Sequence, residues 1–182
     1  MEKGVTGDDL YKQIIKDLHL FHIKVKKNKV YAGATWEIVN EFVKDSLYYT
    51  PNPPEKYSEK PEVFLSKGRG DCYTFARIYW KLLKYMGHKS QLIYIHFYKN
   101  ERFAHMICVF KNRKKLYNYF DIGDIRILNA KSLKEVVFDL EKRLGIKVDY
   151  YAGVELNSAY EYGFRLTWKK DYDSSPGYYF IE

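Results

Sequence analysis

Apolar residues recur at helical spacing most clearly in the segment that begins at Cys72. The segment predicts a helix that ends near Gly87, a glycine placed where a C-terminal cap belongs. One face of this helix is apolar and consists of Phe75, Ile78, Tyr79, Leu82, Leu83 and Met86. The opposite face carries Arg77, Lys81 and Lys84, so the helix is expected to pack one side against a core.

Three further helices are predicted by the same kind of pattern. The first is expected from Asp8 to about Leu20, and the second from about Thr35 to Leu47. The last runs to about Leu144 and is opened by Ser132 and Glu135, which have the spacing of a capping box. The helices therefore gather mainly in the first half of the chain.

Strand-like runs follow the Cys72 helix and are separated by short polar turns. They span Leu92 to Tyr98, Phe103 to Phe110 and Leu116 to Asp121, which predicts an antiparallel meander. A short hairpin is expected over residues 23–31, and a last strand over residues 164–168. The fold class expected is α+β, with a helix packed on a mainly antiparallel β-sheet.

The domain organisation follows from length and composition. At 182 residues with 46% hydrophobic residues, the chain fits one domain over residues 1–182 with its own core. Residues 50–62 hold four of the five prolines and are expected to form a loop. Residues 125–182 are expected to add a helix and a strand to the core.

Cys72 occupies a position that suits a nucleophile. It follows Gly68-Arg69-Gly70-Asp71, a glycine-containing turn, and Asp71 is the natural N-cap of the helix that Cys72 opens. The unpaired N–H groups and dipole of a helix N-terminus favour anions, which increases the reactive thiolate fraction. The alternative is that Cys72 is a small buried hydrophobic residue, as most lone cysteines are.

His105 and Asp121 supply the partners that a thiol nucleophile needs, a base and a group that orients the base. A three-residue loop centred on Arg113 would place His105 directly opposite Asp121 on neighbouring strands. A two-residue loop would instead oppose His105 to Phe120 and turn Asp121 to the other face. We expect the first register, because Asn112 tolerates the backbone conformation that such a loop requires.

The other histidines offer weaker sites. His96 lies on the neighbouring strand, where the pattern predicts no acid beside it. A zinc site formed by His105 and Cys108 is an alternative, but residues three apart on a strand face opposite ways, and no further cysteine pair is present. We expect no metal or other cofactor, and we expect Cys108 to lie in the core.

These residues resemble the transglutaminase-like superfamily. The resemblance rests on Gly70-Asp71-Cys72 with Phe75-Ala76, Ala104-His105 on one strand and Phe120-Asp121 on the next, and covers residues 35–124. It implies a papain-like core and an amide-processing enzyme. In such an enzyme Cys72 attacks the carbonyl of a peptide or protein amide or isopeptide, His105 is the base and Asp121 holds His105. Hydrolysis through a thioester is favoured over protein cross-linking.

One part of this mechanism has no clear assignment from the sequence. A side chain should complete the oxyanion hole beside the backbone N–H of Cys72. Trp36, Tyr49 and Gln13 each carry a suitable donor.

The charge allows a second class of partner. The formal charge is +8, and basic residues cluster at two predicted turns, residues 24–29 and 111–115. We interpret them as solvated turns, although an anionic partner such as nucleic acid remains an alternative. A catalytically idle binding module of the same fold is another alternative.

The sequence also bears on the compartment. No segment approaches the roughly 20 apolar residues of a membrane span, and the opening residues are polar rather than signal-like. With two cysteines, a cytoplasmic protein in a reducing compartment is expected.

Overall fold

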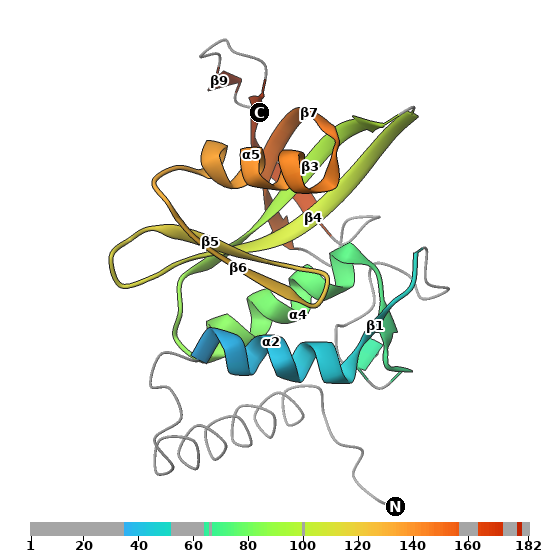
Figure 1. Ribbon diagram of the computed structural model, residues 1–182, viewed down its shortest axis with the longest axis vertical. Coiled ribbons are helices and arrows are strands. Elements are labelled where there is room, and N and C mark those ends of the chain that lie inside the picture. The colour runs from blue at the N-terminus through green and yellow to red at the C-terminus, as the bar shows by residue number, and fades with distance from the viewer. Residues whose placement is uncertain are drawn as a thin grey trace, which may run out of the picture.

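The computed structural model of the chain describes residues 35–51, 64–65, 67–99, 101–156, 164–172 and 178–179. The helix expected at residues 8–20, the hairpin expected at 23–31 and most of the proline-rich loop lie outside the described residues. Three helices are labelled in Figure 1: α2 (Thr35–Ser46), α4 (Cys72–Tyr85) and α5 (Leu133–Leu144). No helix among the described residues is long and apolar enough to cross a membrane.

The main β-sheet has seven strands in the order β6-β5-β4-β3-β7-β8-β9, and every neighbouring pair is antiparallel. The strands are β3 (Ser90–Lys99), β4 (Glu101–Lys111), β5 (Tyr117–Asp121), β6 (Asp124–Ala130), β7 (Lys147–Leu156), β8 (Phe164–Asp171) and β9 (Tyr178–Tyr179). The predicted α+β class and the meander β3-β4-β5 are confirmed. Two short strands, β1 (Tyr48–Tyr49) and β2 (Arg69–Gly70), form a separate parallel pair.

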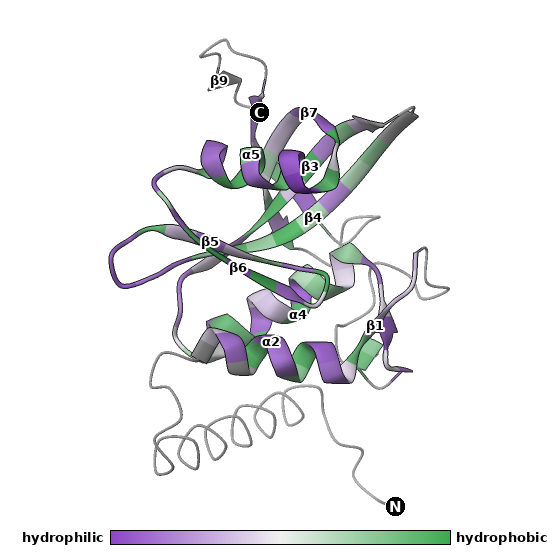
Figure 2. Cartoon of the chain, viewed as in Figure 1, coloured by the Kyte–Doolittle hydropathy of each residue, from purple (hydrophilic) through white to green (hydrophobic). Residues whose placement is uncertain are grey.

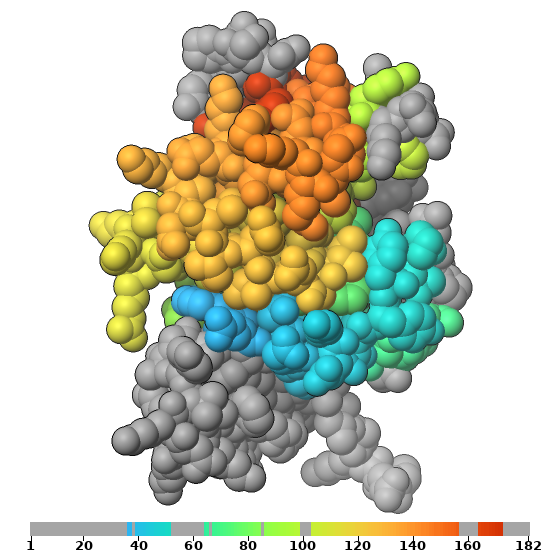
Figure 3. Space-filling view, in the orientation of Figure 1, coloured from blue at the N-terminus to red at the C-terminus, as the bar shows by residue number. Residues whose placement is uncertain are grey.

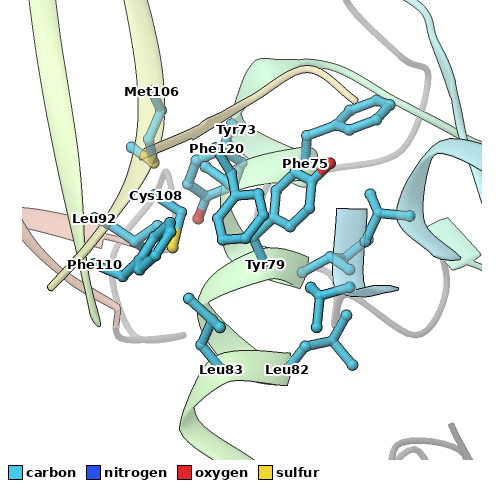
Figure 4. Close-up of a cluster of buried hydrophobic side chains, with 14 of the residues drawn as sticks. Tyr73, Phe75, Tyr79, Leu82, Leu83, Leu92, Met106, Cys108, Phe110 and Phe120 are labelled. Carbon is cyan, nitrogen blue, oxygen red and sulfur yellow. The ribbon is translucent and has the colours of Figure 1, made fainter. Parts of the chain in front are cut away.

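Helices cover both faces of the sheet, with α2 and α4 on one side and α5 on the other (Figure 1). Alternation along β4 divides the core accordingly. Met106, Cys108 and Phe110 pack with α2 and α4, whereas Ile107 and Val109 pack with α5. Hydrophobic and hydrophilic residues interleave along the helices, as amphipathic packing requires (Figure 2). Figure 4 shows α4 directing its apolar side chains toward residues of the strands.

The end caps of the helices follow the sequence signals. The Asp71 carboxylate accepts a hydrogen bond from the backbone N–H of Thr74 at 2.9 Å, and Gly87 has a φ of +76° just past the end of α4. In α5 the Ser132 hydroxyl accepts from the N–H of Glu135 at 3.3 Å, which confirms the cap. Arg77, on the face of α4 opposite the apolar residues, is nevertheless only 8% exposed, and its guanidinium lies over the ring of Tyr73.

The connection between β4 and β5 differs from the predicted three-residue loop. Lys111 pairs with Tyr117, so residues 112–116 form a five-residue connection. Asn112 shapes it, because its side-chain oxygen accepts from the N–H groups of Lys114 and Leu116. The register is therefore shifted by two residues from the expected one. A shift of two preserves which face each side chain occupies.

The positions of two strands in the sheet were not predicted. Strand β7 lies between β3 and β8, and β6 closes the opposite edge. In Figure 3, α2 lies directly against the segment that forms β6. The contact is organised by Asn40 of α2, which donates to the carbonyl of Gly123 at 3.3 Å and accepts from the hydroxyl of Tyr79 at 2.7 Å. The turn that follows Asp121 is thereby tied to both helices.

Candidate active site

Cys72 is held at the start of α4 by a tightly packed turn. Strand β2 places Gly70 beside Tyr49, and the N–H of Thr50 donates to the Gly70 carbonyl at 2.8 Å. A Cβ at Gly70 would lie 2.4 Å from the Thr74 side chain, so only glycine allows the turn to approach the helix this closely. Cys72 is a free thiol and is partly exposed.

His105 and Asp121 lie together, as the sequence predicts. Nε2 of His105 is 2.6 Å from Oδ1 of Asp121, and both residues are buried. The residues are not directly opposed. Continuing the β4–β5 register would put Asp121 opposite Ile107, so His105 reaches it as a diagonal neighbour on the same face.

His105 also lies beside Cys72, whose side chain contributes to its raised pKa and lines the same cavity. Because Nε2 faces Asp121, Nδ1 is the ring nitrogen left for the Cys72 sulfur. Burial lowers the pKa of His105, but the hydrogen bond to Asp121, the interaction with Cys72 and the negative charges of both outweigh burial and raise the pKa to about 10. The arrangement therefore favours a protonated imidazole beside the Asp121 carboxylate.

Asp121 is held by a second residue that the sequence did not indicate. Arg143, on α5, donates a hydrogen bond from Nη2 to Oδ2 of Asp121. Burial raises the pKa of Asp121, but the hydrogen bonds and charges of His105 and Arg143 outweigh it, so the pKa lies below its usual value. Arg143 also lies over the ring of Tyr119, whose hydroxyl donates to Asp139 of α5 at 2.7 Å.

A cavity of about 270 Å³ opens beside the thiol and the imidazole. Its lining comes from the start of α4, from β3 and β4, and from the first residue of β8. The lining residues are Asp71, Cys72, Tyr73, Tyr94, Ala104, His105, Met106 and Phe164. A substrate could thus reach the sulfur and the base from the same space.

The sequence left three donors open for the oxyanion hole, and of the two that the structure describes, Tyr49 lies near Cys72 and Trp36 does not. Trp36 packs against Phe110 and His88, near the C-terminal end of α4. Gln13 lies outside the described residues. The pKa of the Tyr49 phenol is raised, first by burial and then by the charges of Cys72, Asp71 and Asp121, so its hydroxyl remains a donor near the sulfur.

The other candidate residues from the sequence lie outside the cluster of Cys72, His105 and Asp121. Cys108 is fully buried in the core beneath α4, and burial raises the pKa of its thiol. Among the residues that the structure describes, no group of three or more His, Cys, Asp or Glu side chains could hold a metal ion. The expectation that His96 has no acid beside it is wrong, since Asp149 of β7 lies 2.9 Å from its Nδ1.

Comparison with solved structures gives distant matches. LapG from Legionella pneumophila is 22% identical, with a TM-score of 0.46 over 88% of this chain and 81% of that chain. Its calcium-bound form is 21% identical, with a TM-score of 0.45 over 82% of this chain and 76% of that chain.

The family assignment rests on comparison of the sequence with family models. No curated protein matches the chain. The model of the transglutaminase-like superfamily matches residues 23–142, a span that includes Cys72, His105 and Asp121. The chain therefore belongs to the transglutaminase-like superfamily.

Proposed function

We propose that the protein hydrolyses an amide bond in a peptide or protein through a thioester on Cys72. Membership of the superfamily supports a thiol-dependent, peptidase-like role. The observation that carries the finer proposal is the position of His105, which shares a cavity with Cys72 and is hydrogen-bonded to Asp121. This is the relation between nucleophile, base and orienting acid that thiol acyl transfer requires.

In the first half of the reaction the sulfur of Cys72 attacks the carbonyl carbon, and the thiol proton resides on His105. The C–N bond then breaks, His105 gives this proton to the leaving amine, and the acyl group stays on sulfur. In the second half a water molecule attacks the thioester while His105 takes its proton. The C–S bond breaks, which releases the acid and restores the thiolate.

Two donors would stabilise the oxyanion that forms in each half. The N–H of Cys72 lies in the first turn of α4, where N–H groups have no partner within a helix. The Tyr49 hydroxyl would supply the second hydrogen bond, since β1 pairs with the residues just before the nucleophile.

Water rather than an amine is the proposed second nucleophile. Favouring an amine requires a channel that excludes water. Cys72 is partly exposed, which supports access of water to a thioester at this position.

The proposal is tested by incubating the protein with a mixed peptide library and identifying new termini by mass spectrometry. Cleavage is expected in the wild type and in Cys108→Ala, the matched cysteine control, and is expected to disappear in Cys72→Ala. Cleavage that persists in Cys72→Ala would contradict the proposal. Adding a labelled primary amine in excess distinguishes hydrolysis of the thioester from transfer of its acyl group to the amine. If the labelled amide is the main product, transfer and not hydrolysis is the reaction.

A further inference from the structure

The cavity beside Cys72 has an aromatic wall. Phe164, the first residue of β8, lies 5.4 Å from Tyr73 and 6.0 Å from Tyr94 between ring centroids. Met106, 3% exposed, and Ala104 of β4 line the cavity as well. Side chains from four separate elements therefore converge on one largely apolar space.

Asp71, the acidic residue of this lining, is already hydrogen-bonded within its own turn. The Asp71 carboxylate accepts from both the N–H and the hydroxyl of Thr74, at 2.9 and 3.0 Å. The ring of Tyr94 lies 6.2 Å from that of Tyr150 of β7 between centroids, and burial, followed by Tyr150, raises the pKa of Tyr94. A charged substrate side chain entering the cavity would lose water and gain little in return.

The size of the cavity fits one side chain. A cavity of about 150 Å³ lined by apolar residues holds a benzene ring in another protein. The 270 Å³ here leaves room for a branched aliphatic or aromatic side chain. It falls below the roughly 300 to 1,000 Å³ of pockets that enclose a drug-sized ligand.

We propose that this cavity is a specificity pocket that receives an apolar side chain of the residue whose carbonyl Cys72 attacks. The inference rests on the proposed function, because it assumes that Cys72 is the nucleophile. It goes further by naming the substrate class, a peptide with an apolar residue at the scissile bond. A substrate with a charged residue there would be disfavoured.

The test uses acetyl-amino acid chloromethyl ketones with leucine, phenylalanine, aspartate or lysine as the residue next to the reactive carbon. The Cys72 thiolate displaces chloride, a C–S bond replaces the C–Cl bond, and intact-mass spectrometry gives the rate. Each rate is divided by the rate with iodoacetamide, which carries no side chain and so reports thiol reactivity alone. Leucine and phenylalanine probes are expected to react about tenfold faster than the charged probes, from burial of one apolar side chain.

Variants locate the preference in the cavity. Ala104→Trp should fill the space and abolish the advantage of the apolar probes, whereas Ala104→Ser should keep it. Phe164→Ala should reduce the advantage, and Phe138→Ala, at an exposed phenylalanine of α5, should not. Equal rates for all four probes, or a preference for apolar probes that is unchanged in Ala104→Trp, would contradict the proposal of a specificity pocket. Failure of iodoacetamide to label Cys72 ahead of Cys108 would instead overturn the proposed function.

Discussion

Arg143 and His105 hold the two oxygens of one buried carboxylate, that of Asp121. His105 Nε2 lies 2.6 Å from Oδ1, and Arg143 donates to Oδ2. Asp121 is only 4% exposed, so an unpaired carboxylate there would be costly. Helix α5 thus reaches the carboxylate that is hydrogen-bonded to the imidazole, which connects the C-terminal part of the chain to the candidate site.

Replacing Arg143 by methionine should destabilise the protein and loosen His105. We expect a loss of about 1–3 kcal/mol in the free energy of unfolding, measured by urea denaturation at pH 7, because Asp121 loses a charged partner. Because the two partners lower the pKa of Asp121, its contribution to stability is present above its usual pKa of 3.8 and is lost as pH falls through the lower folded value. The Arg143→Met loss should therefore shrink toward pH 2.

The matched control is Arg165→Met. Arg165 pairs with Glu155 at an exposed site, so this change is expected to cost less than about 0.5 kcal/mol. Equal effects of the two substitutions at pH 7 would contradict the role given to Arg143.

The two cysteines should differ sharply in reactivity. Cys72 is partly exposed beside His105, whereas Cys108 is 0% exposed. Iodoacetamide is expected to label Cys72 at least roughly 100-fold faster in the folded protein, since reactivity needs both a thiolate and access. Peptide mapping by mass spectrometry measures both rates. In urea the difference should vanish, and equal labelling without urea would speak against Cys72 as the nucleophile.

The charge state of His105 gives a pH prediction. Its pKa is raised from 6.5 to about 10 by Asp121 and Cys72. A raised pKa contributes stability that is fully present below pH 6.5 and is lost as pH rises through about 10. NMR of the imidazole nitrogens should show His105 protonated at pH 8. Asp121→Asn should lower the titration midpoint, and a neutral His105 at pH 7 in the wild type would contradict the arrangement.

Tyr49→Phe tests the oxyanion donor. Removing one such donor elsewhere costs about 100- to 1,000-fold in rate, and we expect roughly 10- to 100-fold here because Tyr49 is 48% exposed. The reaction measured is acylation by 4-nitrophenyl acetate, which forms an oxyanion. Alkylation by iodoacetamide forms none, so its rate should change little. Tyr48→Phe, at the neighbouring exposed tyrosine, is the control, and a Tyr49→Phe effect no larger than the control would exclude the role.

Local sequence signals predicted the helix caps, the meander and the proximity of His105 to Asp121. Asp71 at the start of α4 and Ser132 at the start of α5 act as predicted, because a cap depends on residues within one turn. The β4–β5 register was wrong by two residues, since the bonds of Asn112 that widen the loop are not visible in a hydrophobic pattern. The even shift explains why the site prediction survived.

Long-range contacts could not be predicted from such local signals. The sequence of β7 contains Asp149, Ala152 and Gly153, which are poor strand formers, so its place beside β3 was missed. The partner of His96 was missed with it. Arg143 lies 22 residues from Asp121, beyond β6 and in the last turn of α5, and no local pattern links the two. Tyr49 could be named as a donor but not chosen before β1 was known to pair with β2.

The most direct test of the central claim is to trap the acyl group on Cys72. The protein is mixed with 4-nitrophenyl acetate, quenched in acid within the first turnover, and analysed by intact mass and peptide mapping. We predict a burst of nitrophenol and one acetyl group on Cys72 that hydroxylamine removes, as a thioester requires. The burst should be absent in Cys72→Ala and strongly reduced in His105→Gln. An acetyl group found on another residue, or a burst that persists in Cys72→Ala, would contradict the account.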